Sequence, residues 1–173
     1  MNPAPRVAFF TDSFHEVNGV GLASRQFEAF AKRRGLPMFS CHAGPETRTW
    51  TEGSITRFEF QRSGAGFQLE SDLRFDLLFV RYVEKVKRAL RAFAPDVVHL
   101  TGPSDCGMLG ALAACQLGLP VTASWHTNIH EFAARRLSGK LMWLPTGVQD
   151  RIARGVERVS LDLTLLFYRM ARV

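Results

Sequence analysis

The chain has 173 residues, of which 46% are hydrophobic and 22% charged, and this is the composition of one globular domain with a core of its own. Lys and Arg outnumber Asp and Glu by 22 to 16, and the resulting net charge of +6 favours anionic partners such as phosphates or acidic lipid surfaces. No apolar run is long enough to span a membrane, the first residues have no signal-peptide pattern, and the three cysteines lack C-x-x-C spacing, so we expect a cytoplasmic protein with reduced thiols.

Apolar segments alternate between strand-like and helix-like along the chain. Strands are expected at Val7–Thr11, Met38–His42, Ile55–Phe60, Val97–Leu100 and Val121–Trp125. Helices are expected at Val20–Arg34, Leu77–Phe93, Cys106–Leu117 and Val148–Arg172. Segments 44–53 and 61–72 are polar and contain glycine, which is typical of loops. The alternation predicts an α/β fold: a Rossmann-like parallel sheet with helices on both faces, in a single domain over residues 1–173.

The first predicted strand leads into a polar loop that closes on a glycine pair. The loop runs to Asn18, and Gly19 and Gly21 stand where the next helix is expected to begin. Glycines at a strand–helix junction let a phosphate approach the bare N–H groups at the positive end of the helix. The loop is therefore either a diphosphate cradle or an ordinary glycine-rich turn, and the residues alone favour neither.

Polar residues also follow two other strands of the predicted sheet. Asp12 and His15 follow the strand at Val7–Thr11. Ser104 and Asp105 follow the strand at Val97–Leu100, and His126, Thr127 and Asn128 follow the strand at Val121–Trp125. Because the carboxyl ends of parallel strands share one edge of a sheet, we expect these loops to converge on a ligand-binding crevice. Helix capping is the competing role for each residue, and for Asp105 it is the expected one.

Other site chemistries fit the sequence less well. The dinucleotide-binding fingerprint has Ser24 where its third glycine belongs and no acidic residue closing the second strand. His126 and His130 lie one helical turn apart, but no third ligand accompanies them, so no metal site is predicted. The chain has no nucleophile elbow, and no zinc finger or compact basic helix–turn–helix that would indicate a nucleic-acid partner.

Three segments together resemble the N-terminal domain of GT-B fold glycosyltransferases of family 4, the retaining, glycogen-synthase-like group. Residues 10–20 (FTDSFHEVNGV) are similar to that family's opening strand and loop. Residues 95–100 (PDVVHL) are similar to its next characteristic strand, and residues 124–128 (SWHTN) to the segment after the following strand. Order and spacing agree over nearly the whole chain.

The resemblance implies transfer of a sugar from a nucleotide-sugar donor with retention of anomeric configuration. It implies that Gly19, Val20 and Gly21 approach the donor diphosphate and that His126 contacts the donor sugar as the catalytic-site residue. It also implies an acceptor pocket shaped by the loops that carry Asp12, His15, Asn18, Ser104, Asp105, Thr127 and Asn128. No cofactor and no metal is implied, and the acceptor is a lipid or a saccharide.

The chain departs from that family in one large respect. The family has a second Rossmann-like domain with an Arg/Lys pair and an E-x7-E motif for the nucleotide, and neither is found in this sequence. The resemblance therefore implies a truncated acceptor-side domain that is inactive alone and needs a C-terminal nucleotide-binding domain, in cis or in trans.

Two alternatives to an enzyme domain of this kind stay open. The apolar segment Leu161–Val173 favours a non-catalytic binding or assembly module whose partner covers it, and an NAD(P)-binding oxidoreductase is a third choice. The basic helix expected at Leu77–Phe93 is either a solvated face or a peripheral contact with an anionic membrane.

Overall fold

The computed structural model describes residues 4–64, 67–68, 74–124 and 146–169. These fall into two compact units, one ending at Ser124 and one formed by the C-terminal helix, and each is described by itself.

A six-stranded, mostly parallel sheet forms the first unit, with the strand order β3-β4-β2-β1-β7-β8. Its strands are β1 (Val7–Phe10), β2 (Met38–Gly44), β3 (Arg48–Glu52), β4 (Ile55–Gln61), β7 (Val97–Leu100) and β8 (Val121–Ala123). All neighbours pair in parallel except β3, which pairs antiparallel with β4. Counted without β3, the five parallel strands have the Rossmann order 3-2-1-4-5.

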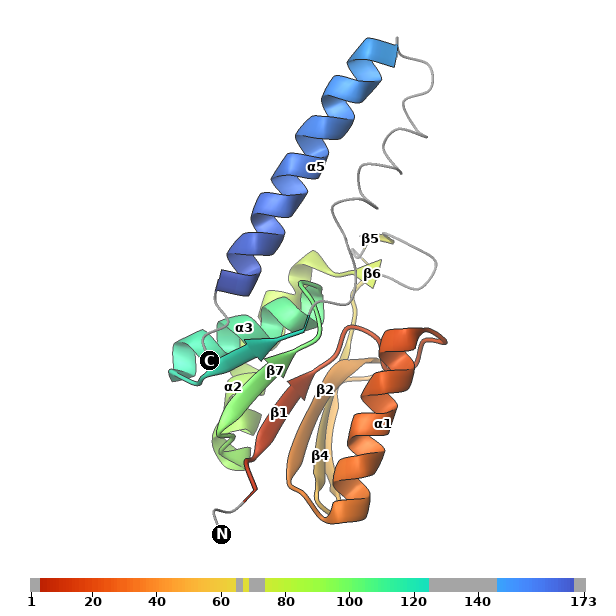
Figure 1. Cartoon of the computed structure of the whole chain (residues 1–173). Coiled ribbons are helices and arrows are strands. Elements are labelled where there is room, and N and C mark those ends of the chain that lie inside the picture. Colours follow the sequence, from red (N-terminus) through yellow and green to blue (C-terminus); the bar gives the residue numbers. More distant parts are fainter. Residues whose placement is uncertain (1–3, 65–66, 69–73, 125–145, 170–173) are drawn as a thin grey trace. The chain divides into compact units, whose positions relative to one another are not determined.

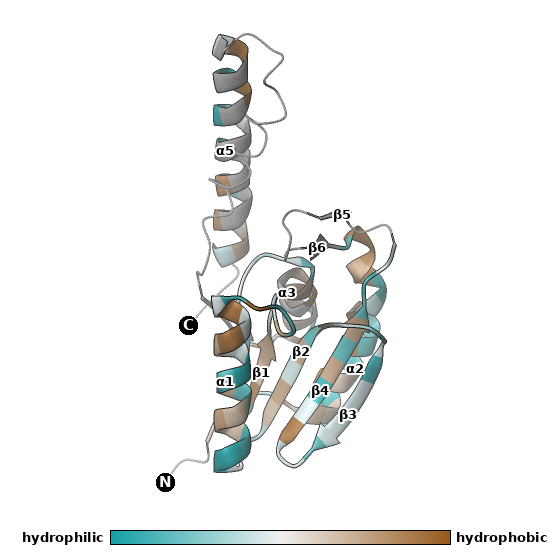
Figure 2. Cartoon of the chain, turned by 90° about the vertical axis from the view of Figure 1, so that its right-hand side faces the viewer, coloured by the Kyte–Doolittle hydropathy of each residue, from teal (hydrophilic) through white to brown (hydrophobic). Residues whose placement is uncertain are grey.

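Helices cover both faces of this sheet, as the alternating pattern predicts (Figures 1 and 2). Helix α1 (Gly19–Arg34) joins β1 to β2, whereas α3 (Asp105–Leu117) joins β7 to β8 in the opposite direction across the sheet. Right-handed crossovers in opposite directions place their helices on opposite faces. Helix α2 (Val83–Phe93) packs beside α3. The predicted α/β class is thereby confirmed.

Short-range signals fix the helix ends. Asn18 and Ser104 are the N-caps of α1 and α3, and their side chains accept hydrogen bonds from N–H groups of the first turn. Gly35 and Gly118 end the same helices in the left-handed conformation, at φ 63° and 65°. The core between the layers is aromatic and aliphatic, and its fully buried members include Phe10, Phe39, Phe60, Leu90, Leu100 and Leu109.

The structure differs from the sequence-based expectation in the middle of the first unit. Residues 44–53 were expected to be a loop, but they contain β3, which forms a hairpin with β4 through Gly53 at φ 60°. Trp50 of β3 packs against the guanidinium groups of Arg48 and Arg57, 4.3 and 5.7 Å from the ring centre. Polar and charged residues build this edge strand, so no apolar alternation announces it.

Three smaller differences follow the same hairpin. The second expected loop, 61–72, holds the short strand β5 (Phe67–Gln68), which pairs with β6 (Arg74–Phe75) just after that loop. The expected helix Leu77–Phe93 begins as a 3-10 helix, η1 (Leu77–Tyr82), capped by Asp76. Strand β8 ends at Ala123, two residues earlier than expected.

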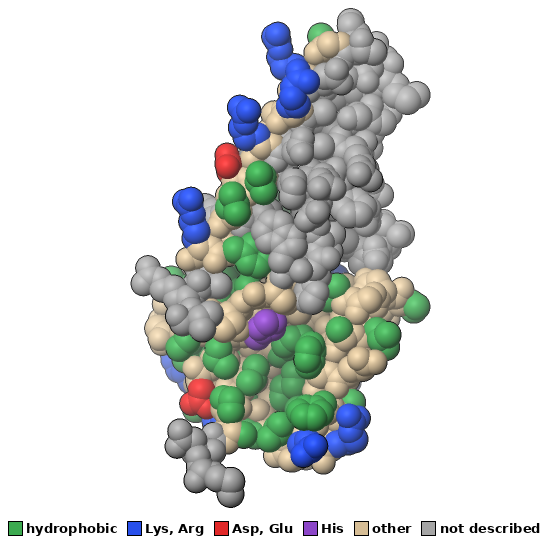
Figure 3. All heavy atoms as spheres, viewed as in Figure 1, with side chains coloured by type: hydrophobic (Ala, Val, Ile, Leu, Met, Phe, Trp, Pro, Cys, Tyr) green, Lys and Arg blue, Asp and Glu red, His purple; other side chains and the backbone are tan. Residues whose placement is uncertain are grey.

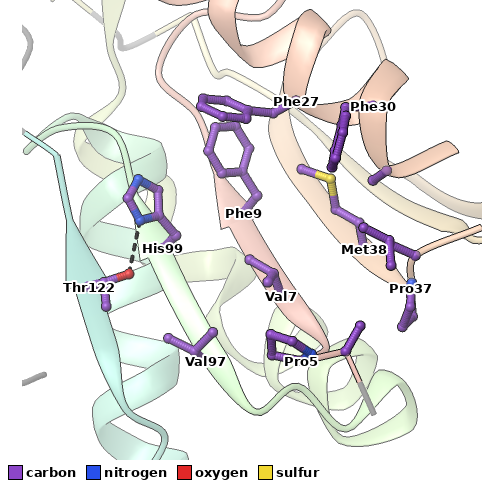
Figure 4. A pocket seen from close by; sticks show the side chains of 13 residues that line it. Pro5, Val7, Phe9, Phe27, Phe30, Pro37, Met38, Val97, His99 and Thr122 are labelled. Carbon is purple, nitrogen blue, oxygen red and sulfur yellow. Dashed lines mark hydrogen bonds between the residues drawn. The ribbon is translucent and has the colours of Figure 1, made fainter. Parts of the chain in front are cut away.

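An apolar groove of about 380 Å³ lies on the face of the sheet that carries α1. Side chains of β1, β2, β7, β8 and α1 line it, among them Phe9, Phe27, Met38, His99 and Thr122 (Figure 4). His99 stacks on Phe9 with ring centres 5.6 Å apart and bonds Thr122 through Nδ1 at 2.9 Å. Figure 3, which is viewed as Figure 1 is, shows hydrophobic side chains gathered on this face of the first unit.

The second unit is described through helix α5 (Thr146–Arg169). It begins two residues before the expected start at Val148, and residues 170–172 of the expected helix lie outside the described residues. Searched over the described part of the chain, no helix combines the length and apolarity needed to cross a bilayer.

Candidate functional site at the carboxyl edge of the sheet

The loop after β1 is held against the first turn of α1. Asn18 accepts a hydrogen bond from the Gly21 N–H at 2.8 Å, and a Cβ on Gly21 would lie 2.5 Å from the carbonyl oxygen of Glu16. Gly21 is therefore needed for this close approach, and its N–H is already bonded within the chain. A helix gives no internal acceptor to its first N–H groups, so those of Gly19 and Val20 are the ones that can face an anion.

Arg25 of α1 fixes the course of this loop. Its guanidinium donates to the carbonyl oxygens of Phe14 at 2.5 Å and of Glu16 at 3.2 Å. Glu16 in turn accepts from the Phe14 N–H at 2.9 Å. The loop that presents the N–H groups of α1 is thus ordered by its own helix.

Asp12 joins the loop after β1 to the loop after β7. Its N–H donates to Thr101 Oγ1 at 3.0 Å, and its carboxylate accepts a short hydrogen bond from the Ser104 hydroxyl. Its Oδ2 lies over Gly102, where a Cβ would come within 2.3 Å. Withdrawal from water raises the pKa of Asp12 to about 6, although the Ser104 hydroxyl opposes the shift. Two of the three loops therefore converge as expected.

Asp105 has a different role from the one expected of it. Ser104 is the N-cap of α3, so the prediction that Asp105 caps this helix is wrong. Asp105 is completely buried, and Arg62 binds it in a bidentate pair, Nε to Oδ2 at 2.6 Å and Nη2 to Oδ1 at 2.8 Å. The Asp76 N–H donates to the same carboxylate at 3.1 Å. Both oxygens are therefore occupied by the chain itself.

A row of polar residues crosses three neighbouring strands near this edge. His42 of β2, Glu59 of β4 and Arg48 of β3 are register partners, so their side chains lie side by side. Arg48 Nε donates to Glu59 Oε2 at 2.9 Å. Oε1 faces two histidines: His15 Nε2 at 3.3 Å, from the loop after β1, and His42 Nδ1 at 3.9 Å.

The His42 ring is buried in this row. Its neighbour Phe14 stacks on it with ring centres 4.1 Å apart and planes 6° from parallel. Burial, with His15 close by, lowers the pKa of His42 to about 4, so the ring is neutral at pH 7. Its Nε2 has no hydrogen-bond partner among the described residues. Within the same part of the chain, His15, His42 and Glu59 bring one ligand atom each to within 4.8 Å of one another.

A cavity of about 420 Å³ opens beside these groups. It is bounded by the loop after β1 and by the ends of β2 and β4, with polar and charged side chains on its wall. The lining residues are His15, Glu16, Ala43, Gly44, Pro45, Gln61 and Arg62. A polar cavity at the carboxyl edge of a parallel sheet is where α/β domains bind ligands.

The described residues contain only part of the expected site. Asp12, His15, Asn18, Ser104 and the glycine loop lie at the carboxyl edge, with Asp105 beneath it. His126, Thr127, Asn128 and the His126–His130 pair lie outside the described residues. His42, Glu59 and Arg62 were not expected in the site. A charged residue between two buried phenylalanines, Phe58 and Phe60, was the signal that could have found Glu59.

The strand order and the helices on both faces define a Rossmann-type α/β domain, with polar loops at the carboxyl edge of its sheet. The family model of the glycosyl transferase 4-like domain matches residues 7–162, and the chain belongs to this family. The family resemblance of the three sequence segments is thereby confirmed.

Individual relatives are similar to parts of the chain. A GDP-mannose-dependent alpha-mannosyltransferase of Mycobacterium tuberculosis is 46% identical over 50 residues, which are 29% of this chain and 13% of that protein. Two solved structures of UDP-N-acetylglucosamine 2-epimerases are each 9% identical in sequence to this chain. The match to the one from Listeria monocytogenes covers 90% of this chain and 38% of that chain, with a TM-score of 0.46. The match to the other covers 71% of this chain and 32% of that chain, with a TM-score of 0.41. The chain spans well under half the length of these proteins.

Proposed function

We propose that this chain is the N-terminal, acceptor-side domain of a retaining glycosyltransferase that moves a sugar from a nucleotide-sugar donor to a lipid or saccharide acceptor. Membership of the glycosyl transferase 4-like family supports the reaction class. The observation that carries the assignment of the site is the meeting of the loops after β1 and β7 through Asp12, Thr101 and Ser104 at the carboxyl edge.

The donor diphosphate is assigned to the N-terminus of α1. Negative charge grows on the leaving diphosphate during transfer, and preorganised N–H groups at a positive helix end stabilise such charge. Gly19 and Val20 supply these groups, while Gly21 permits the close packing of the loop. In this proposal His126 contacts the donor sugar, and the acceptor attacks from the same face as the leaving group, so no protein nucleophile is required.

The acceptor is assigned to the 420 Å³ cavity beside the donor loop. His15 and Gln61 offer hydrogen-bonding groups to sugar hydroxyls there. Asp12, Asn18, Ser104 and Asp105 support the walls rather than contact the acceptor, because each is bonded within the chain. In this proposal, Thr127 and Asn128 border the same pocket.

A lipid acceptor brings the domain to a membrane surface. Four basic residues of η1 and α2 are exposed, Arg81, Lys85, Arg88 and Arg91, whereas Lys87 is half-buried and bonds Glu84 at 2.7 Å. Exposed cations of this density favour anionic lipid headgroups. We therefore include peripheral binding to the inner face of the cell membrane in the proposal.

A second, nucleotide-binding domain completes the proposed enzyme, and the test compares the chain with and without one. The 173-residue chain, and a longer protein in which it is followed by a nucleotide-binding domain, are incubated with sugar-labelled nucleotide sugars and membrane lipids or oligosaccharides. We expect labelled product of unchanged anomeric configuration from the longer protein only. An inverted product would contradict the retaining mechanism. Absence of transfer with tight binding of a partner protein would favour a non-catalytic assembly module, and quenching of NADH fluorescence an oxidoreductase.

A further inference from the structure

Two histidine nitrogens share one carboxylate oxygen at the edge of the sheet. His15 Nε2 lies 3.3 Å from Glu59 Oε1, and His42 Nδ1 lies 3.9 Å from the same atom. We propose that His15, His42 and Glu59 form a binding site for a divalent transition-metal ion of the zinc class. This proposal does not depend on the transferase function.

The separations fit the size of such an ion. Zinc binds imidazole nitrogen and carboxylate oxygen at about 2.0–2.2 Å in a tetrahedron, which places neighbouring ligand atoms about 3.3–3.5 Å apart. All three ligand atoms here lie within 4.8 Å of one another, and the pair formed by His15 and Glu59 already has the tetrahedral separation. Rotation of the His15 side chain, which is 56% exposed, brings its Nε2 closer to His42, and a small shift of the His42 ring closes the 3.9 Å separation between Nδ1 and Glu59 Oε1.

The Glu59 carboxylate is held in place by Arg48 on the side away from the histidines. Arg48 donates to Oε2 of Glu59, so that Oε1 is the oxygen left to face the histidines. A Cβ on Gly44 would lie 2.2 Å from the Glu59 carboxyl carbon, so the absence of a side chain at Gly44 gives this carboxylate its position. Carboxylate ligands of metals are commonly oriented by a second hydrogen bond of this kind.

The buried histidine is poorly satisfied without a ligand. Only 2% of the His42 side chain is exposed, and its Nδ1, the nitrogen that faces Glu59, has only a 3.4 Å contact with the carbonyl of Ala43. Burying a polar ring that lacks good hydrogen bonds is unfavourable. An ion bound at Nδ1 replaces this poor contact with a strong one and leaves the ring proton on Nε2, while Phe14 stacks on the ring.

Three protein ligands leave the fourth position of a tetrahedral ion open, as in zinc sites that bind water or substrate rather than in closed structural sites. His15 belongs to both the cluster and the wall of the 420 Å³ cavity. An ion bound here thus presents its open position beside that cavity, where an oxygen ligand such as water or a hydroxyl group completes its coordination.

The test is a Zn²⁺ titration of the purified 173-residue chain against a chromophoric chelator, with Co²⁺ absorption as a second readout. We expect one equivalent to bind and Co²⁺ to give the intense visible bands of a four-coordinate site. His15→Ala should weaken Zn²⁺ binding at least about 100-fold, since it removes a direct ligand from an exposed position where folding is not at risk. Gly44→Ala displaces the Glu59 carboxylate and should weaken binding as well.

The matched control is the double variant His126→Ala/His130→Ala, which removes the other pair of histidines. It should bind Zn²⁺ as the unmodified chain does. Loss of binding in this control with full binding by His15→Ala would assign the ion to residues 126 and 130 and overturn the proposal. Failure of the unmodified, folded chain to compete with the chelator for Zn²⁺ would overturn it equally.

Discussion

Arg62, which follows β4, donates two hydrogen bonds, of 2.6 and 2.8 Å, to the Asp105 carboxylate at the start of α3. Only 13% of the Arg62 side chain and none of the Asp105 side chain is exposed. The pair joins two segments 43 residues apart and fixes the floor of the carboxyl edge. Bidentate pairing of a guanidinium with a carboxylate is the strong form of an ion pair, and burial makes its loss costly.

Arg62→Ala is expected to destabilise the domain by about 3 kcal/mol, because it leaves a buried carboxylate without its counter-ion. Urea unfolding followed by far-UV circular dichroism measures the change. Arg88→Ala removes an exposed cation from α2 and is the control, with an expected change within about 0.5 kcal/mol. Equal midpoints for the two variants would contradict the structural role of the pair.

Asn18→Ala is expected to cost about 1 kcal/mol, since the side chain that caps the Gly21 N–H is lost. Asn18→Asp keeps the acceptor and adds a negative charge at the positive end of α1, so it should retain the stability. Thermal unfolding of both variants separates the cap from other contacts of this side chain. A similar loss in both would show that the cap is not the source of the effect.

Substitution by alanine should destabilise the domain at one helical glycine and not at another. A Cβ on Gly110 in α3 would lie 2.6 Å from Phe10 and 2.8 Å from Leu100, both ring or methyl carbons of the core. Gly110→Ala should therefore destabilise by about 1–3 kcal/mol through overpacking. Gly155 in α5 has no atom within 4 Å of such a Cβ, so Gly155→Ala should cause no loss. The midpoints of denaturant unfolding measure the stability of both variants. A loss of stability in Gly155→Ala alone would contradict the packing argument.

The stability of the domain should depend on pH through Asp12 and His42 with opposite signs. The pKa of Asp12 rises to about 6 in the folded state, so between about pH 4 and 6 the native state holds this proton and stability falls as pH rises. The pKa of His42 falls to about 4, so from about pH 6.5 down to 4 the unfolded state takes up the proton and stability falls as pH falls.

Asp12→Asn isolates one of these two contributions. It keeps an oxygen that accepts from Ser104 but removes the titration, so the free energy of unfolding should rise more steeply with pH between 4 and 6 than in the unmodified chain. Unfolding free energies measured at half-unit pH steps give both slopes. A variant whose curve is parallel to that of the unmodified chain would show that Asp12 titrates normally.

The features that could be predicted from the sequence are those encoded locally. The runs at Val7–Phe10 and Val97–Leu100 are apolar apart from His99, because these strands lie inside the sheet with a neighbour on each side. A cap of α3 was expected in the loop after β7, but at Asp105 rather than at its neighbour Ser104. Strand β3 was missed because its stability comes from pairing with β4 and from the packing of Trp50 against Arg57 of that partner strand as well as Arg48, and no apolar alternation in its own residues signals these contacts.

The site could be predicted only to the level of its loops. Their convergence follows from parallel strands sharing one edge, and Asp12 and Ser104 do meet there. Glu59, which faces His42, comes from β4, and Arg62, which pairs with Asp105, directly follows β4; the position of Glu59 beside His42 depends on the register of β2 against β4. A shift of register by one residue would turn Glu59 to the opposite face, so spacing alone could not place it.

The two borders of the sheet are unlike each other. On one side the antiparallel strand β3 carries Arg48 and Glu52, charged side chains of the kind that discourage further pairing. On the other side β8 lies at the border, and among the described residues β7 is its one strand partner. Among the described residues, the border at Val121–Ala123 is therefore the one that lacks such charges, and the sheet is more open to an added strand there than at β3.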